Sequence, residues 1–127
     1  MRLAFALCLL ATGAPAETPM TAAEFEDWST GKTLDYYIDG QLWGSEQHLD
    51  GRATLDADVD GPCIKGRWSP RGDDICFAYH ISPGPHCWRF LRDGNTVLAE
   101  NLDDPGSRYV VQGTDAPLPC AGPDVGV

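Results

Sequence analysis

The chain has 127 residues, a formal net charge of −10 and five cysteines, and 43% of its residues are hydrophobic. This length predicts one small domain, and the hydrophobic fraction is large enough to build a core. The negative charge argues against nucleic acid and anionic membranes as partners, because phosphate contacts need clustered Lys and Arg. No run of residues approaches the roughly 18 apolar residues of a membrane-spanning helix. We therefore expect a small, acidic, soluble domain.

Residues 1–16 have the layout of a secretory signal peptide. Met1-Arg2 supplies a positive charge, residues 3–11 form an apolar run, and Ala14-Pro15-Ala16 is a small-x-small cleavage site. Cleavage after Ala16 leaves a single mature domain of residues 17–127, which predicts a periplasmic or secreted location. The alternative is an N-terminal core helix, which would have to bury residues 12–15 as its end.

Four cysteines remain once cleavage removes Cys8: Cys63, Cys76, Cys87 and Cys120. An even number of cysteines in a small exported domain predicts two disulfides, and the spacing lacks the C-x-x-C motif of a zinc or redox site. The expected strand registers hold Cys76 too far from both Cys63 and Cys87 to form a bridge with either. We therefore prefer the pairing of Cys63 with Cys87 and of Cys76 with Cys120.

Residues 21–30 are predicted to form a helix. Thr21 and Glu24 match a capping box, Phe25 and Trp28 share one face, and Gly31 is a natural C-terminal stop. This narrow apolar face predicts that the helix lies on the core as a lid.

Turn signals every eight to twelve residues predict a β-meander over residues 33–112. Asp39-Gly40 is the clearest of them, a two-residue hairpin turn, and further turns are expected at 50–51, 70–73, 82–85, 93–95 and 103–106. Short turns join antiparallel neighbours, so we expect an up-and-down meander of about eight strands. The expected strands are 33–38, 41–48, 52–58, 63–69, 74–80, 86–92, 96–100 and 108–112.

One face of these strands carries large rings and the other carries charges. Trp88 and Phe90 share a face, for example, while Arg89 between them points into solvent. Such a sheet must curl or be covered, which predicts a mainly β fold: a small barrel or half-barrel closed at one end by the helix. Gly66, between Ile64 and Trp68 on the inner face, is expected to mark a bend.

The inward rings are candidates for binding a small apolar ligand, with Tyr36 as a polar handle. An eight-stranded barrel is also often just wide enough to be packed solid, and a filled interior is the preferred expectation. The candidate ligand-binding residues are Tyr36, Trp43, Trp68, Phe77, Tyr79, Trp88 and Phe90.

Three alternating carboxylates and a glycine match the first half of a calcium loop: Asp56, Asp58, Asp60 and Gly61. The twelfth position is Arg67, where a bidentate Glu is needed. We therefore prefer a strand whose acidic side chains are in solvent and whose residues 55, 57 and 59 face inward. His80 and His86 flank an expected turn and supply only two ligands, which are too few for a metal site.

Catalytic motifs are missing from the chain, which has no G-x-S-x-G, H-E-x-x-H or phosphate-binding loop. We therefore predict that it is not an enzyme and has no cofactor. A perturbed acid or histidine inside a cavity would change this view, and Asp35, Glu46 and His48 are the first residues to inspect. Residues 113–127 are rich in Pro and Gly and are expected to form a tail tethered by Cys120.

The cysteine-rich segments, taken together, carry a pattern. It consists of Cys63-x-x-Gly66-x-Trp68, Ile75-Cys76-Phe77-x-Tyr79, Cys87-Trp88 and a tail from Leu118 to Val127. This pattern resembles that of small exported proteins of unknown function from alphaproteobacteria. The segments Thr33-Leu34-x-Tyr36 and Gly44-x-Glu46-Gln47 look similar too, so the resemblance covers nearly all of the mature chain. It implies a periplasmic location and adds no mechanism.

Two functions follow from these observations. The first is a non-catalytic periplasmic barrel, either structural or binding a small ligand. The alternative is an acidic interaction or inhibitor module for a cationic secreted protein, because the mature chain has 8 Lys and Arg against 19 Asp and Glu, a net charge of −11. A saturable small-molecule titration would favour the first function, and a specific protein partner that is lost at high salt would favour the second.

Overall fold

Nine strands joined in one antiparallel sheet make up most of the described chain. The computed structural model describes residues 17–58 and 61–120, so the predicted signal peptide lies outside it. The strands are β1 (Thr18–Pro19), β2 (Thr33–Ile38), β3 (Gln41–His48), β4 (Ala53–Asp58), β5 (Ile64–Arg71), β6 (Asp74–Tyr79), β7 (Ser82–Asp93), β8 (Thr96–Asn101) and β9 (Arg108–Thr114). One helix, α1 (Ala22–Ser29), precedes β2, and a short 3-10 turn, η1 (Asp50–Arg52), precedes β4.

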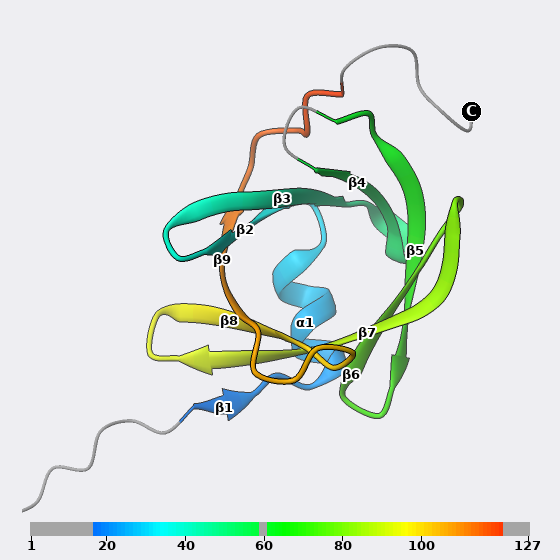
Figure 1. The fold of residues 1–127 in the computed structure, drawn as a ribbon. Helices are drawn as coiled ribbons and strands as arrows, with labels where there is room; N and C mark the ends of the chain where they lie inside the picture. The colour runs from blue at the N-terminus through cyan, green and yellow to red at the C-terminus, as the bar shows by residue number, and fades with distance from the viewer. Residues whose placement is uncertain (1–16, 59–60, 121–127) are drawn as a thin grey trace, which may run out of the picture.

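Strands β2 to β9 form a closed up-and-down barrel (Figure 1). Each pairs antiparallel with the next along the chain, and β9 closes the barrel by pairing with β2. The prediction of a mainly β meander curled into a barrel of about eight strands is therefore confirmed. Strand β1 was not predicted; it has only two residues and pairs with β7 at Leu91 and Arg92.

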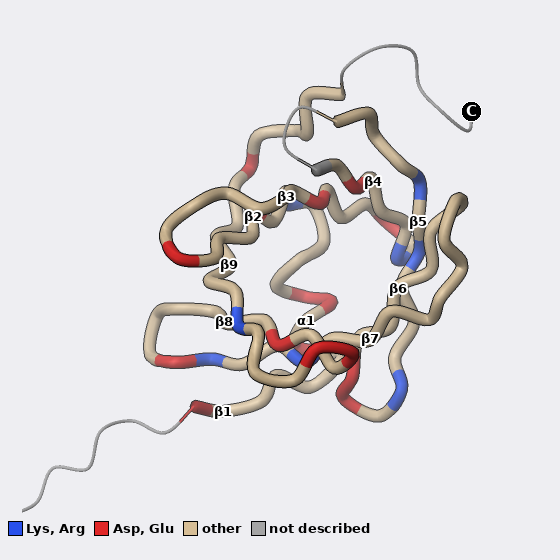
Figure 2. The backbone as a smooth tube through the Cα atoms, in the orientation of Figure 1, with Lys and Arg blue, Asp and Glu red and all other residues tan. Residues whose placement is uncertain are grey.

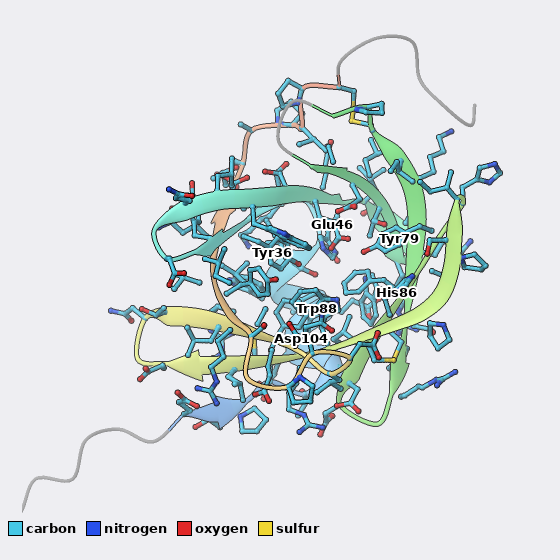
Figure 3. All side chains as sticks on the ribbon, in the orientation of Figure 1. Tyr36, Glu46, Tyr79, His86, Trp88 and Asp104 are labelled. Carbon is cyan, nitrogen blue, oxygen red and sulfur yellow. A yellow bond between two sulfur atoms is a disulfide. The ribbon has the colours of Figure 1, made fainter. Side chains whose placement is uncertain are left out.

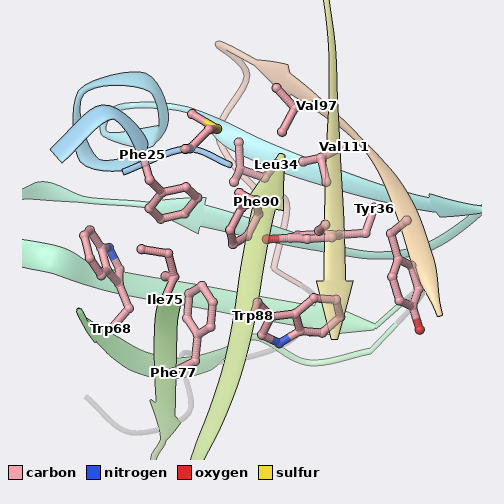
Figure 4. Packing of buried hydrophobic residues seen from close by; sticks show 13 residues of the cluster. Phe25, Leu34, Tyr36, Trp68, Ile75, Phe77, Trp88, Phe90, Val97 and Val111 are labelled. Atoms are coloured by element: carbon pink, nitrogen blue, oxygen red, sulfur yellow. The ribbon is translucent and has the colours of Figure 1, made fainter. Parts of the chain in front are cut away.

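Alternation along the strands sends the large rings into the barrel, as predicted from the sequence. On β2, Leu34 and Tyr36 are buried, and on β7, Trp88 and Phe90 are buried. Figure 4 shows these side chains in one cluster with Ile75, Phe77, Val97 and Val111 from other strands. Every strand of the barrel except β3 and β4 thus contributes apolar side chains to this core cluster.

Helix α1 closes one end of the barrel. The Thr21 hydroxyl accepts a hydrogen bond from the Glu24 amide at 3.1 Å, as expected of an N-cap residue. Phe25 is fully buried, with its ring centroid 4.3 Å from that of Phe90 and 5.2 Å from that of Trp68. The predicted short N-terminal helix that closes one end of the barrel is confirmed. Figure 1 looks along the barrel, with α1 seen inside the ring of strands.

The connection between β6 and β7 differs from the prediction. The expected turn at residues 82–85 is part of β7, and the chain reverses at His80 and Ile81 instead. Tyr79 lies opposite Ser82 and Phe77 lies opposite His86, so β7 has two more residues than β6 over this stretch. The extra residues form a bulge at Pro83–Pro85, since a proline cannot donate to the ladder and is tolerated at bulges.

Two disulfides are present, as predicted, but their pairing differs from our preference. Cys63 is bonded to Cys120, and Cys76 is bonded to Cys87. The preferred pairs, Cys63–Cys87 and Cys76–Cys120, are wrong because they assumed a β6–β7 register without the bulge. The bulge shifts β7 by two residues and brings Cys87 directly opposite Cys76, with the two Cα atoms 4.0 Å apart.

The segment after β9 runs back along the barrel to the start of β5. The Thr33 hydroxyl donates to the Ala116 carbonyl at 2.6 Å, and the Leu118 amide donates to the Gln47 side chain at 3.1 Å. The bond from Cys120 to Cys63 then holds the end of this segment beside β5. The tail is thus tied across β2 and β3 by two hydrogen bonds and one covalent bond.

Candidate functional site

The end of the barrel away from α1 encloses a cavity of about 290 Å³. Its location follows from strand direction, because β2, β4, β6 and β8 all run away from the helix and the cavity residues lie toward their far ends. Five rings form most of its wall: Tyr36, Trp43, Phe77, Tyr79 and Trp88. The remaining lining residues are Gly44, Glu46, Asp56, Ala57, Ser82, His86, Asn101 and Asp103. Figure 3 shows Tyr36, Glu46, Tyr79, His86 and Trp88 gathered around the centre of the barrel.

Five of the seven predicted ligand-binding residues therefore line this cavity, and two do not. Trp68 and Phe90 lie instead at the α1 end, where both rings pack against Phe25. The preferred expectation of a filled interior holds only for that end. Since one short helix fills one end of the barrel, the rings at the other end have no side chain from α1 to pack against.

Glu46 is the central polar group of the cavity. It lies on β3 and is only 2% exposed. Its Oε1 atom is 2.8 Å from Nε2 of His48 and accepts a hydrogen bond from the Tyr36 hydroxyl at 3.4 Å, while its Oε2 atom accepts one from the Tyr79 hydroxyl at 3.1 Å. Three donors from β2, β3 and β6 therefore hold one carboxylate in a fixed position (Figure 3).

His48 supports Glu46 from the filled side of the barrel. Its ring is 1% exposed and meets the rings of Phe25 and Phe77 edge-on, at centroid distances of 5.5 and 6.1 Å. A carboxylate can only accept hydrogen bonds, so the His48 tautomer that pairs with Glu46 is the one with a proton on Nε2. The pair marks the boundary between the filled and the open halves of the interior.

Asp56 lies beside Glu46 and corrects a prediction. The two residues are paired in register on β3 and β4, and both line the cavity. The expected strand with its acidic side chains in solvent is therefore wrong for Asp56. The Asp58 side chain, Val59 and Asp60, which belong to the same calcium-loop pattern, lie outside the described residues. Among the described residues, no group of three His, Cys, Asp or Glu is arranged to hold a metal ion.

Burial keeps the two cavity tyrosines protonated. Removal from water raises the pKa of Tyr36 and Tyr79 well above the ordinary value of 10.0, and the nearby Glu46 carboxylate raises both pKa values further. Both hydroxyls are therefore donors to Glu46 in the folded barrel.

This raised pKa predicts how stability changes in alkali. In the unfolded chain both tyrosines ionise near pH 10.0, whereas in the barrel they keep their protons. Their contribution to stability is therefore fully present below about pH 10 and declines as the pH rises above it. We expect the tyrosinate absorbance of Tyr36 and Tyr79 to appear only as the far-ultraviolet circular dichroism of the barrel is lost.

The Tyr36→Phe, Tyr79→Phe double variant is the control for this titration, and it should lack the late tyrosinate signal. Ionisation of all four tyrosines of the wild-type chain with unchanged circular dichroism would contradict the account.

The mouth of the cavity is formed by Trp43 and by β7 near its bulge. Trp43 is 46% exposed, and its ring centroid is 6.2 Å from that of Trp88. On β7, the Ser82 hydroxyl is 2.9 Å from Nε2 of His86, whose ring stacks on Tyr79 at 5.7 Å. A Ser–His contact is one part of a nucleophilic site, which also needs a carboxylate to orient the histidine; here Nε2 of His86 is within hydrogen-bond reach of both the hydroxyl and the carbonyl of Ser82. His80 and His86 do not flank a turn as expected, because the chain reverses at His80 and Ile81 and His86 lies within β7.

Gly66 allows the Tyr79 ring to lie close against its backbone, in addition to any bend predicted at this position. It lies opposite Tyr79 in the β5–β6 register. A Cβ atom there would come within 2.7 Å of the Tyr79 ring and 2.8 Å of the Thr54 hydroxyl. The absence of a side chain at Gly66 therefore lets the Tyr79 ring lie where its hydroxyl reaches Glu46.

The chain matches no known protein family, no curated protein and no solved structure. The resemblance to exported alphaproteobacterial proteins thus stays a prediction. In the described part of the chain, none of the helical structure is long and apolar enough to cross a membrane.

Proposed function

We propose that this protein is a non-catalytic barrel that binds one small ligand in the cavity at the end opposite α1. The observation that carries the proposal is the cavity itself, about 290 Å³ in volume and lined by five rings and a few polar groups. This volume is at the lower end of the range for small-molecule sites, and a mainly apolar wall with few convergent polar groups is typical of them. The ligand is therefore small, about the size of one ring with a short substituent.

The polar groups support the proposal because they are already in position. Glu46 is buried and held by Tyr36, Tyr79 and His48. Burying a carboxylate is unfavourable unless it is well hydrogen-bonded, and an apolar residue would stabilise the barrel at least as well. An arrangement that costs stability and faces a cavity is better explained by recognition of a ligand than by folding.

Export to an oxidising compartment is part of this proposal. Two disulfides in a small domain support it, since disulfides persist mainly in secreted and periplasmic proteins. The predicted signal peptide and the resemblance to exported proteins point to the same location. The alternative of an acidic interaction module has less support, because the acidic residues are spread around the barrel, over strands, turns and α1 alike, rather than gathered on one side (Figure 2).

Quenching of tryptophan emission tests the binding function. The neutral probe 4-nitrobenzyl alcohol fits the proposed size and quenches tryptophan on contact. We expect saturable quenching, a large part of which is lost in Trp43→Phe, because Trp43 lines the cavity. The matched control is Trp28→Phe, since Trp28 lies on α1 outside the cavity and should leave the saturable signal unchanged.

Free N-acetyltryptophanamide gives the reference for collisional quenching. The binding function is overturned if 4-nitrobenzyl alcohol quenches the protein linearly and without saturation, as it does this reference. The same must then hold for its charged analogues 4-nitrobenzylamine and 4-nitrobenzoate.

A further inference from the structure

We infer that the ligand is a small organic cation, whose positively charged nitrogen binds at Glu46 and whose apolar body lies among the rings. This inference rests on the proposed binding function and names the class of molecule that the cavity selects.

The charge of the lining is the first argument. Three carboxylates border the cavity, from Glu46, Asp56 and Asp103, and no Lys or Arg does among the described residues. Glu46 and Asp56 are directly opposite each other on neighbouring strands, an arrangement in which like charges repel. A cation placed between them relieves this repulsion, whereas an anion increases it.

The hydrogen-bonding capacity of Glu46 is the second argument. A carboxylate offers about four acceptor positions, and three are used by His48, Tyr36 and Tyr79. Oε2 receives only the Tyr79 hydroxyl, so the unused position is on the oxygen beside that ring. Both tyrosines already direct their protons to Glu46, so the centre of the site offers acceptors, and the ligand has to bring the donor.

The rings are the third argument. A cation within about 6 Å of an aromatic face is attracted by the negative charge of that face, and Trp gives the strongest attraction. Tyr36, Trp43 and Trp88 lie together, with ring centroids 5.9 to 6.5 Å apart. Walls of this kind stabilise a cation without trapping it in a rigid ion pair.

A metal ion is the less suitable cation. The described residues contain no group of three or more metal-ligating side chains in suitable positions. Hard metal ions need about six oxygen ligands and lose hydration against apolar walls, whereas an organic cation keeps its charge beside rings. The chemistry of the wall therefore favours nitrogen cations.

The length of the cavity sets the size of the ligand. Trp43 at the mouth and Glu46 near the floor are three residues apart on β3, which corresponds to at most about 10 Å along the strand at about 3.3 Å per residue, since the chain bulges at Trp43. One aromatic or aliphatic ring with a one- or two-carbon arm ending in an ammonium group spans that distance.

A matched set of three probes tests the inference. The probes are 4-nitrobenzylamine, 4-nitrobenzyl alcohol and 4-nitrobenzoate, which share one ring and differ in charge. Their dissociation constants are measured at pH 7 by tryptophan quenching and by calorimetry. A charge-assisted hydrogen bond predicts that the amine binds at least about tenfold more tightly than the alcohol. The benzoate is expected to bind most weakly.

Charge-neutralising variants locate the effect. Glu46→Gln is expected to reduce the amine-to-alcohol ratio to within about threefold, and Asp56→Asn to reduce it in part. Asp35→Asn is the matched control, because Asp35 lies on β2 between the inward residues Leu34 and Tyr36 and is bonded to Ser45 outside the cavity. It removes the same charge and should keep the ratio. If Glu46→Gln does not fold, the comparison of Asp56→Asn with Asp35→Asn decides.

Each outcome separates this inference from the proposed function. Equal affinity for the amine and the alcohol, or tighter binding of the benzoate, overturns the cation inference and leaves small-molecule binding intact. An amine preference that Asp35→Asn lowers as much as Glu46→Gln and Asp56→Asn also overturns it, because the effect then comes from net charge alone. If none of the three probes binds saturably, both the inference and the binding function fail.

Discussion

Replacing Phe25 by alanine is expected to lower the free energy of unfolding by about 3–5 kcal/mol. Phe25 is the fully buried side chain through which α1 packs on the barrel, in contact with the rings of Phe90, Trp68 and His48. Its removal leaves a void that these neighbours fill only in part, because they are held on three different strands. Urea unfolding of the oxidised protein, followed by tryptophan emission, measures the loss.

The control for Phe25→Ala is Asp27→Ala. Asp27 is exposed on the same helix, so its replacement should change the free energy of unfolding by no more than about 0.5 kcal/mol. If Phe25→Ala costs less than about 1 kcal/mol, the helix does not close the barrel in the way its contacts indicate.

Removal of the Cys63–Cys120 disulfide, by serine at both positions, is expected to cost about 4 kcal/mol of unfolding free energy. The reason is the length of chain that the bond closes, since its cysteines are 57 residues apart and the loop restricts the unfolded chain accordingly. The same removal also frees the tail that is bonded to Thr33 and Gln47. Denaturant unfolding of the double variant measures the effect.

The second disulfide provides the comparison. Cys76 and Cys87 are only 11 residues apart, and on the same entropy argument their replacement by serine costs about 3 kcal/mol. A larger loss from this pair than from Cys63 and Cys120 would show that loop length does not set the order. Replacing both cysteines of a pair avoids a free thiol, which would exchange with the remaining disulfide.

Local signals predicted most of the barrel because each hairpin carries its own turn chemistry. Asp39 and Gly40 have φ values of 50° and 76°, the left-handed conformations that a two-residue hairpin turn requires and that this residue pair favours. The strands on either side, 33–38 and 41–48, were predicted with the bounds that the structure gives. The helix cap at Thr21 was likewise predictable, because it depends only on Thr21 and Glu24, which are three residues apart.

The disulfide pairing was not predictable in the same way. It depends on the register of β6 against β7, and Pro83-Gly84-Pro85 has the composition of a turn although it forms a bulge inside β7. Composition cannot distinguish the two, since a bulge and a turn both need residues that leave the ladder. An error of two residues in that register was enough to exclude the correct pair.

The candidate site was half predictable. Alternation identified the inward rings, but which of them pack solidly and which surround a cavity depends on where α1 docks, a contact between distant parts of the chain. Simple alternation from the inward Trp43 would place Glu46 outside the barrel, but a bulge at Trp43 in the β2–β3 register lets both residues line the cavity. Asp56 was placed in solvent because residues 55, 57 and 59 were taken as the inward face of this strand, whereas the register pairs Asp56 with the inward Glu46. Binding sites are where such rules fail.

The filling of only one end of the barrel has a consequence for how such a protein diversifies. The barrel rings that pack on Phe25 of α1 are those of His48, Trp68 and Phe90, and none of them lines the cavity. The two ends of the barrel meet at Phe77, which lines the cavity and contacts the His48 ring. Substitutions at Trp43, Asp56 or Ser82 therefore change the wall of the cavity and leave the packing around the helix intact. A scaffold organised in this way is a good starting point for evolving new specificities, in nature or in the laboratory.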